Sequence, residues 1–573
     1  MIKKIFSLLN QNNYNKKFIY VLFIMVVGMF FELLSIGLFI PLIGILVSEN
    51  GLNDYPIILE SLDTFDISSK ESIIISALLF LVFIYLVKGF LLIIIAWIQN
   101  KFLSNLSSII SIHLFKGYLL SPFSFYLEAN SSELIRNIKD EIYQFIFSLQ
   151  AVMLLVTEIL LSVASLVLLI YVEPLGTIIV FSTFIVIGGS YLFIMKDKFF
   201  KWGEDRQNFE GRINSNMIEG FGGIKEIKLT GREFFYVKRF SDLTLAKNII
   251  TAKQLTAQQI PKFFIELFAI VGLVGLTITL FLSEKGISNS LPIIGVFMAA
   301  AIRLMPSINR IVNSLQVIRY STSAIDLLFN ELSNIGTIKT FNNLLINESF
   351  NDKIIMNDIS FKYPNSTNYT ISKLNLEIKK GDVIGIIGKS GAGKSTLINI
   401  ILGLIDPTIG TIFVDGKNIK KNISNWQSQI GYVPQSVYVF DETLEKNIAF
   451  GVLDTDIDSE KVLESLNKVQ LKDLESELKS NGNLKLGEIG SRISGGQKQR
   501  IGIARTLYQG SSVLIFDEAT SSLDVDTEKD IMKVIYGFKR DKTILIISHK
   551  EEILKGCDKI YKLVDSQLIL KTT

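Results

Sequence analysis

The chain has 573 residues, enough for several domains, and 49% of them are hydrophobic. The mean hydropathy of +0.40 is high for a soluble protein, and the apolar residues are concentrated in the first part of the chain, in runs too long for globular strands. The net charge of +3 points to no class of partner, and the single cysteine, Cys557, excludes an intrachain disulfide and a cysteine metal cluster.

Six apolar runs are long enough to be membrane spans. They cover residues 18–47, 73–98, 149–171, 175–195, 263–282 and 291–305. The segment 48–72 carries six acidic residues and one lysine, whereas 99–148 and 196–259 are rich in lysine and arginine. Because positive residues favour the cytoplasmic side, we expect the N-terminus, both long loops and the C-terminal half to be cytoplasmic.

The two long loops keep a helical periodicity, with breaks near Ser121-Pro122-Phe123 and at residues 220–223. We expect two helical hairpins that project from the membrane, each with a short turn at its tip; two separate soluble subdomains are the alternative. Residues 56–67 have one apolar and one acidic face, which is typical of an amphipathic helix on the outer surface, although a plain loop fits as well.

Among the charged residues within or at the ends of these runs, we single out Glu32, Lys88, Lys262 and Arg303. Intramembrane charge is costly and usually faces a cavity or a partner. We therefore predict that Lys88 lines a cavity suited to an anionic substrate. For Lys262 and Arg303, which lie near run ends, snorkelling to the interface is the ordinary alternative. Glu32 is a candidate partner for one of these bases.

Residues 331–352 are polar and asparagine-rich, and we interpret them as a linker. The membrane domain would then cover residues 1–330 and a soluble α/β domain residues 353–573. In the latter, apolar strands alternate with helical stretches, which predicts a largely parallel core sheet.

A glycine-rich loop in this domain lies between a buried strand and a helix. Glycines there let backbone N–H groups surround phosphate oxygens, and the helix dipole adds positive potential. Lys394 would reach the β- and γ-phosphates, and the Ser395 hydroxyl would bind Mg²⁺. The predicted phosphate-binding residues are Gly388, Lys389, Ser390, Gly391, Ala392, Gly393, Lys394, Ser395 and Thr396.

A second buried strand, 513–516, ends in two carboxylates, Asp517 and Glu518. Ligands sit at the carboxyl ends of strands in such sheets, so Asp517 would hold Mg²⁺ and Glu518 would polarise a water for attack on the γ-phosphate. Between the two elements, Ser494, Gly495, Gly496 and Gln497 open another helix, a second anion site. Such a site could serve the nucleotide of another subunit.

The order of these motifs resembles that of the ATP-binding cassette (ABC) transporter family, with Ile493 where leucine is usual before the signature motif. Six spans followed by one cassette is similar to an exporter half-transporter, and the resemblance covers the whole chain. It implies a helical transmembrane domain followed by a P-loop ATPase domain, with ATP and Mg²⁺ as cofactors.

The resemblance also implies residue roles. Gln435 would be the Q-loop glutamine that senses Mg²⁺ and the attacking water, and His549 the switch histidine that contacts the γ-phosphate. Tyr363 would stack on adenine. Asp524, with Ser494 to Gln497, would complete the site across a homodimer. The turns near Pro122 and at 221–223 would be coupling helices.

The stretch Ile302 to Ile311, with Glu32, Lys88 and Pro261-Lys262, also resembles the bacterial lipid-linked oligosaccharide flippases of protein N-glycosylation. That implies a polyprenyl-pyrophosphate oligosaccharide moved from the inner to the outer leaflet of the cytoplasmic membrane. Lysine stands at 88 and 262 where arginine is expected, which keeps the charge but loses the planar fork. A lipid A or multidrug exporter shares every cassette motif, and an ATP-gated channel or regulator is an alternative of another class. No nucleic-acid partner is expected.

Overall fold

The computed structural model divides into two units, Met1–Ser121 with Glu128–Thr340, and Pro122–Leu127 with Phe341–Thr573. It describes residues 2–11, 14–37, 70–172, 174–282, 287–336, 349–363, 366–480, 484–487, 490–520 and 523–571. The predicted amphipathic segment 56–67 and part of the first apolar run lie outside these ranges.

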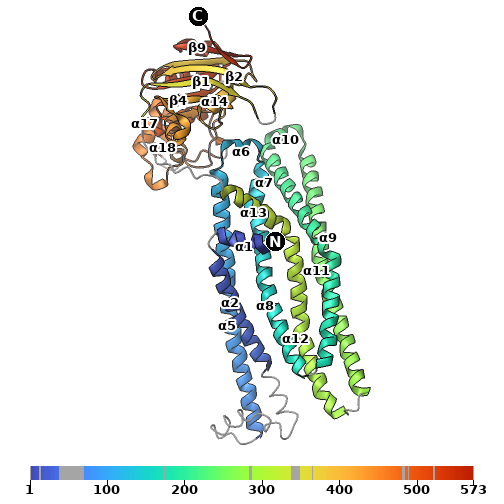
Figure 1. Cartoon of the computed structure of the whole chain (residues 1–573). Helices are drawn as coiled ribbons and strands as arrows, with labels where there is room; N and C mark the ends of the chain where they lie inside the picture. Colours follow the sequence, from blue (N-terminus) through green and yellow to red (C-terminus); the bar gives the residue numbers. More distant parts are fainter. Residues whose placement is uncertain are drawn as a thin grey trace. The chain divides into compact units, whose positions relative to one another are not determined.

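The described part of the chain before residue 337 is helical apart from short turns (Figure 1). Its elements are α1 (Ile2–Gln11), α2 (Asn15–Gly37), α5 (Lys70–Leu119), α6 (Phe123–Glu128), α7 (Ser131–Arg136), the π-helix η1 (Asn137–Glu141), α8 (Ile142–Val172), α9 (Pro174–Gly222), α10 (Ile224–Thr230), α11 (Glu233–Leu282), α12 (Ile287–Tyr320) and α13 (Thr322–Gly336). α13 continues past the predicted start of the linker because Leu332 and Ile335 are buried.

Helices α5, α9 and α11 are unusually long, with 50, 49 and 50 residues. At 1.5 Å per residue each is about 75 Å long, more than twice the roughly 30 Å of a hydrocarbon core. The predicted helical extensions of both long loops are therefore confirmed. The breaks fall where expected, after Leu119 and at Gly222, and Figure 1 shows α10 at the end of the hairpin formed by α9 and α11.

Every described part of the six apolar runs lies on a helix. In the described part of the chain, two helices are long and apolar enough to span a membrane, Leu78–Leu119 and Ser131–Val167. The pair Lys3–Asn10 and Asn15–Phe31, bent by 117°, would add a third if it forms one span. The remaining runs lie on α9, α11 and α12, which pack along one another, and α12 also packs along α8.

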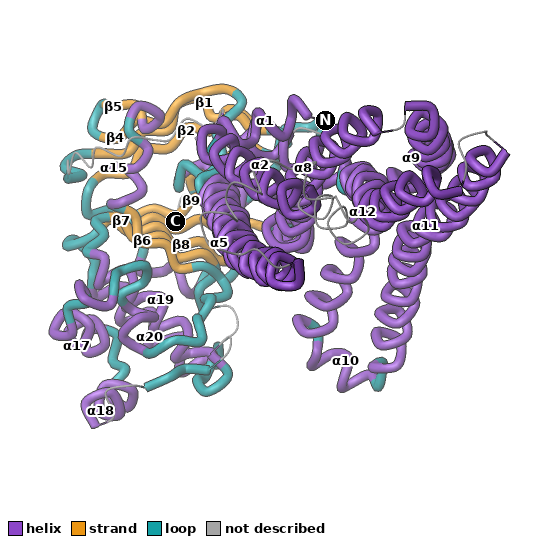
Figure 2. The backbone as a smooth tube through the Cα atoms, turned by 90° about the horizontal axis from the view of Figure 1, so that it is seen from below, coloured by secondary structure: helices purple, strands orange, loops and turns teal. Residues whose placement is uncertain are grey.

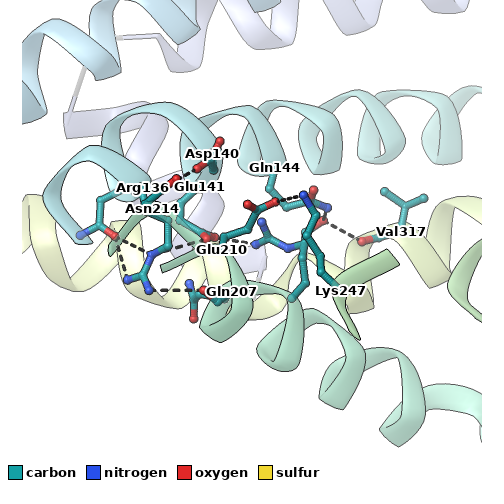
Figure 3. A network of polar contacts seen from close by, with 12 residues as sticks. Arg136, Asp140, Glu141, Gln144, Gln207, Glu210, Asn214, Lys247 and Val317 are labelled. Carbon is teal, nitrogen blue, oxygen red and sulfur yellow. Dashed lines mark hydrogen bonds and ion pairs between the residues drawn. The ribbon is translucent and has the colours of Figure 1, made fainter. Parts of the chain in front are cut away.

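A buried polar network joins η1 and α8 to the neighbouring helices (Figure 3). The carboxylate of Glu141, with no exposed surface, lies 2.8 Å from the guanidinium of Arg206 on α9 and 3.9 Å from that of Arg136 on α7. The Gln144 amide donates to the Ser321 hydroxyl at 2.7 Å. Charged groups in the interior require such partners, so the network fixes how these helices cross.

The second unit contains two β-sheets. The larger has the order β10-β9-β3-β8-β7-β6 and the smaller the order β2-β1-β4-β5. The strands are β1 (Lys353–Phe361), β2 (Ile371–Lys379), β3 (Val383–Gly388), β4 (Ile409–Val414), β5 (Lys417–Asn418), β6 (Ile430–Val433), β7 (Val513–Asp517), β8 (Thr543–Ser548), β9 (Lys559–Val564) and β10 (Gln567–Leu570). The predicted parallel core sheet is confirmed apart from β10, whereas the smaller antiparallel sheet was not predicted.

Helices surround these sheets. They are α14 (Lys394–Ile401), α15 (Ile423–Ser428), α16 (Leu444–Ile448), α17 (Ser459–Lys468), α18 (Lys472–Ser480), α19 (Gly495–Gln509) and α20 (Val525–Gly537). Short 3₁₀ turns lie at Ile419–Lys421, Asp454–Asp456 and Glu552–Gly556.

The larger sheet is buried on both faces. In β7, Val513 and Ile515 pack with α14 and the smaller sheet, whereas Leu514 and Phe516 pack with α19 and α20. The same alternation holds in β3 and β8. A parallel strand covered on both faces reads as an unbroken apolar run, which is why these strands were recognisable in the sequence.

We expect Glu141→Ala to destabilise the helical unit strongly. Removing the carboxylate leaves two buried guanidinium groups without their counter-ion, which costs about 3–5 kcal/mol. Thermal unfolding of the detergent-purified protein would show the shift.

The matched control is Glu219→Ala, because Glu219 pairs with Arg239 at 2.8 Å on an exposed surface. That pair should contribute less than about 1 kcal/mol. Equal shifts for the two variants would contradict a special role for the buried network.

Candidate nucleotide site

Four neighbouring parallel strands bring the predicted site residues to one edge of the larger sheet. β3 is followed by the glycine loop, β8 by His549 and β6 by Gln435, and β7 ends in Asp517. Their order, β3-β8-β7-β6, is continuous, and all three pairings are parallel. Figure 2 shows β6, β7 and β8 beside one another. Because the carboxyl ends of parallel strands meet at one edge, residues more than 150 positions apart converge there.

The glycine loop has the conformation that phosphate binding requires. Gly391 and Gly393 have φ values of +80° and +99°, which L-residues rarely adopt. A Cβ at Gly393 would also lie 3.0 Å from the carbonyl oxygen of Thr370. Gly393 is the N-cap of α14, so the orphan N–H groups of the first helical turn lie directly after the loop.

Lys394 is 8% exposed, and its ammonium lies at the centre of the site. It donates to the carbonyl oxygens of Gly388 at 2.8 Å and Lys389 at 3.2 Å, and it pairs with a carboxylate oxygen of Glu518 at 3.2 Å. The next side chain, Ser395, is exposed. An ammonium with carbonyl and carboxylate partners is held in one place, where it can meet phosphate oxygens.

Three predicted residues gather around the carboxylate of Glu518. Besides Lys394, the amide of Gln435 donates to it at 3.4 Å, and Nδ1 of His549 lies at 3.7 Å. Glu518 has φ +47°, in the left-handed region, and its N–H donates to the carbonyl of Ile547 at 2.9 Å. A strained residue that its neighbours hold in place is often functional.

The Asp517 carboxylate has a different partner. Its Oδ2 accepts a hydrogen bond from the Tyr432 hydroxyl at 3.1 Å. Burial raises the pKa of Asp517, and burial also raises the pKa of Tyr432. The sequence analysis missed Tyr432, because its contact depends on β6 lying beside β7.

The donor set fits Mg²⁺. Among the described residues, no group of three or more His, Cys, Asp or Glu side chains could hold a metal ion on its own. The nearby oxygen donors are the hydroxyl of Ser395 and the carboxylate of Asp517. Mg²⁺ commonly takes one or two protein ligands and completes its shell with water and phosphate oxygens, which suits such a sparse set.

The residues from Ser494 to Gln497 form the start of α19. The Ser494 hydroxyl accepts from the N–H of Gln497 at 3.3 Å, and the Gln497 side chain accepts from the N–H of Ser494 at 2.8 Å. This is a capping box. In the described part of the chain, neither residue has a hydrogen bond or ion pair with Lys394, Asp517 or Glu518. The motif's role toward another subunit's nucleotide stays a prediction.

α19 nevertheless contacts the Gln435 segment. The amide of Gln499, which is 4% exposed, donates to the carbonyl oxygen of Gln435 at 2.7 Å. The helix that begins with the Ser494 motif therefore supports the segment that reaches Glu518.

Asp524 caps α20 by accepting from the N–H of Thr527 at 3.0 Å, and this hydrogen bond lowers the pKa of Asp524.

Tyr363, the predicted adenine platform, lies two residues after the end of β1. Its ring packs edge-on against Phe361, with centroids 5.0 Å apart, and its hydroxyl lies 3.1 Å from that of Thr396. The aromatic residue is thus tied to the helix that follows the glycine loop. Its role toward adenine stays a prediction.

The structure describes the side chains of two of the four charged residues predicted to line a substrate cavity. Lys88 is half-buried, with its ammonium 4.9 Å from the ring centroid of Tyr85. Lys262 is exposed and lies 3.9 Å from Glu266. The side chains of Glu32 and Arg303 lie outside the described part of the structure. The common cavity stays a prediction.

The structure adds an ion pair that the sequence analysis missed. Glu158 on α8 lies 2.8 Å from the guanidinium of Arg310 on α12, and its side chain is 9% exposed. Glu158 is the one charged residue in the apolar run 149–171, so the reasoning applied to Glu32 could have found it.

Comparison with known families matches both parts of the chain. Residues 18–306 match the model of the ABC transporter transmembrane region, and residues 371–521 match the ABC transporter model. The chain belongs to the ABC transporter family. It is a half-transporter with one helical transmembrane domain and one α/β ATPase domain, and it hydrolyses ATP to drive transport across a membrane.

Known relatives agree with this membership. The chain is 23% identical over 474 residues to the ATP-dependent lipid A-core flippase of Ralstonia nicotianae, covering 82% of this chain and 79% of that protein. It is 28% identical over 458 residues to the flippase of the same name from Francisella tularensis subsp. tularensis SCHU S4, covering 78% and 74%. A bacterial Atm1-family ABC exporter with ATP bound has the same fold, with a TM-score of 0.74, 19% identity, and coverage of 97% and 95%.

We expect Lys394→Met to weaken ATP binding by roughly tenfold to a hundredfold, because charge-assisted hydrogen bonds contribute about 1.5–3 kcal/mol each. Methionine keeps the apolar stem and removes the ammonium. Titration with a fluorescent ATP analogue would measure the change.

Lys420→Met is the control, because Lys420 forms an exposed pair with Asp406 at 3.1 Å. Unchanged affinity in the Lys394 variant would refute its role in phosphate binding.

Proposed function

We propose that this ABC transporter is an ATP-driven lipid flippase that works as a homodimer in the bacterial inner membrane. The observation that carries this proposal is the convergence of Lys394, Gln435 and His549 on Glu518, because a transporter driven by hydrolysis needs a held carboxylate base. A half-transporter has one cassette, and no cassette motif here is degenerate, so two identical chains are the economical assembly. The lysine- and arginine-rich loops support a cytoplasmic N-terminus and cassette.

The proposed chemistry assigns a role to each side of the site. Backbone N–H groups of the glycine loop and the ammonium of Lys394 bind the phosphates, and Tyr363 stacks on adenine. Ser395, Asp517 and Gln435 hold Mg²⁺, which when bound neutralises charge on the β- and γ-phosphates.

Hydrolysis is assigned to the residues around Glu518. Its carboxylate orients and polarises the attacking water, and His549 donates toward the γ-phosphate. Ser494 to Gln497 and Asp524 of each chain complete the site of the other, so ATP binding closes the two cassettes and hydrolysis releases them.

The proposed substrate is an anionic glycolipid. The relatives named as lipid A-core flippases favour a lipid A-type molecule over the polyprenyl-pyrophosphate oligosaccharide. One observation still favours the oligosaccharide. Residues 302–311, with the bases at 88 and 262, resemble the lipid-linked oligosaccharide flippases. Both lipids join an apolar part to phosphate groups, which basic residues such as Lys88 can neutralise.

Flipping in proteoliposomes tests this proposal. The purified protein is supplied with a lipid A-core glycolipid or with a pyrophosphate-linked oligosaccharide lipid, and arrival in the opposite leaflet is followed. We expect ATP-dependent flipping of the lipid A-type molecule, because the relatives compared above carry that name. Preferential flipping of the oligosaccharide lipid would establish the other substrate.

Glu518→Gln is the internal control. It keeps the side-chain shape, so ATP binding should persist while hydrolysis falls about 10²- to 10⁴-fold and flipping stops. Flipping that continues in this variant would refute the assigned base, and movement of neither lipid would refute the glycolipid class.

Lys88→Ala should reduce flipping roughly tenfold while basal ATPase activity changes little, because the lost ammonium would contact the substrate rather than the nucleotide. The measurement is the ratio of lipid flipped to ATP hydrolysed. The matched control is Lys101→Ala, since Lys101 lies on the same helix and sits over Trp97 at 4.6 Å, much as Lys88 sits over Tyr85. Equal loss of both activities in Lys88→Ala would indicate a structural lysine.

A further inference from the structure

The end of strand β6 contacts both carboxylates of the nucleotide site. Tyr432 donates to Asp517 at 3.1 Å, and Gln435, three residues later, donates to Glu518 at 3.4 Å. These acceptors are consecutive residues at the end of β7, the neighbouring strand. A single four-residue segment therefore reaches the two adjacent acidic side chains.

Strand register explains how Tyr432 reaches its acceptor. Tyr432 pairs with Ile515 in the parallel ladder between β6 and β7, and Asp517 follows Ile515 by two residues. Side chains two positions apart on a strand lie on one face, so Tyr432 and Asp517 share the face of the sheet that packs against α14. A tyrosine is long enough to reach a diagonal neighbour on the adjacent strand, which a shorter side chain is not.

The group that donates to Asp517 is the neutral hydroxyl of Tyr432. A phenol donates one hydrogen bond and brings no charge, so the Asp517 carboxylate keeps its full negative charge for a cation. The nearby ammonium of Lys394 pairs instead with Glu518. One oxygen of Asp517 is held by Tyr432. Among the described residues, no hydrogen bond or ion pair occupies Oδ1, so it can take a metal ion or its water. Hydrogen bonds of this kind orient a metal-binding carboxylate.

We propose that Tyr432 is a positioning residue for Mg²⁺: its hydroxyl holds the Asp517 carboxylate in the orientation in which Oδ1 takes the ion, directly or through water. This inference rests on the proposed assignment of Asp517 as the magnesium ligand. Because Tyr432 and Gln435 belong to one short segment, a displacement of that segment acts on the metal carboxylate and on the hydrolytic carboxylate together.

A purely structural role is the competing explanation. The Tyr432 side chain is 37% exposed, so the ring could simply cover the sheet edge. Tyr432→Phe separates the two explanations, because it keeps the ring and removes the one hydrogen bond. A covering role predicts unchanged metal affinity, whereas a positioning role predicts weaker metal binding with unchanged metal-free nucleotide binding.

The test uses the purified full-length protein with a non-hydrolysable ATP analogue. Mn²⁺, which replaces Mg²⁺ and is visible by electron paramagnetic resonance, is titrated to give its dissociation constant. We expect Tyr432→Phe to raise this constant about tenfold, as for other groups that orient metal ligands. Affinity for the analogue in EDTA should stay at the wild-type value. ATPase assays should show a higher Mg²⁺ requirement, with kcat at saturating Mg²⁺ within about twofold of wild type.

Two further variants make the result decisive. Tyr438→Phe removes the hydroxyl of another exposed tyrosine, three residues after Gln435, and should leave Mn²⁺ affinity unchanged. Asp517→Asn should lose most of the Mn²⁺ affinity. If Asp517→Asn weakens Mn²⁺ binding and Tyr432→Phe does not, the positioning role is refuted and the metal assignment stands. If Asp517→Asn has no effect either, the assignment of the metal ligand is refuted, and the inference with it.

Discussion

The parallel pairing of β3, β8, β7 and β6 is the constraint on which the nucleotide site depends. Each strand is apolar and buried on both faces, so the sheet is stable without any contribution from the polar residues that follow it. The carboxyl ends can therefore carry groups that would be unfavourable elsewhere, such as the buried ammonium of Lys394 and the left-handed backbone at Glu518. The buried core of the sheet stabilises the fold, and the residues at the carboxyl-end edge form the functional site.

In the helical domain, buried ion pairs rather than paired strands hold the elements in place. Its membrane runs are apolar, whereas the extensions beyond them contain the ion pair of Glu141 with Arg206 and its neighbours. Such a network has few alternative arrangements of similar energy, because each shift of a helix would leave a buried charge without its partner. The π-helix of η1 lies in this network, and an irregular turn there places Asn137 and Glu141 toward it. We therefore expect the helical extensions to move as rigid bodies.

Most of the cassette could be predicted from the sequence because its motifs are local. A strand followed by glycines and Lys394, or by Asp517 and Glu518, carries its own geometry within a few residues. The smaller antiparallel sheet could not be predicted in this way, since pairing of β1 with β2 and β4 depends on partners distant in the chain. The contact of Tyr432 with Asp517 was missed for the same reason: it follows from which strand lies beside β7, and the sequence does not state strand order.

In the membrane half, hydropathy located the helices but not the pairing of charges. The reasoning that singled out Lys88 treated each charge in isolation, whereas Glu158 and Arg310 form a pair across two helices whose contact no local pattern reveals. This pair bears on the substrate. A guanidinium already neutralised by a buried carboxylate attracts a phosphate less than an unpaired one does, so Arg310 contributes less positive potential than its charge alone suggests. A count of basic residues therefore overstates the anion-binding capacity of the membrane domain.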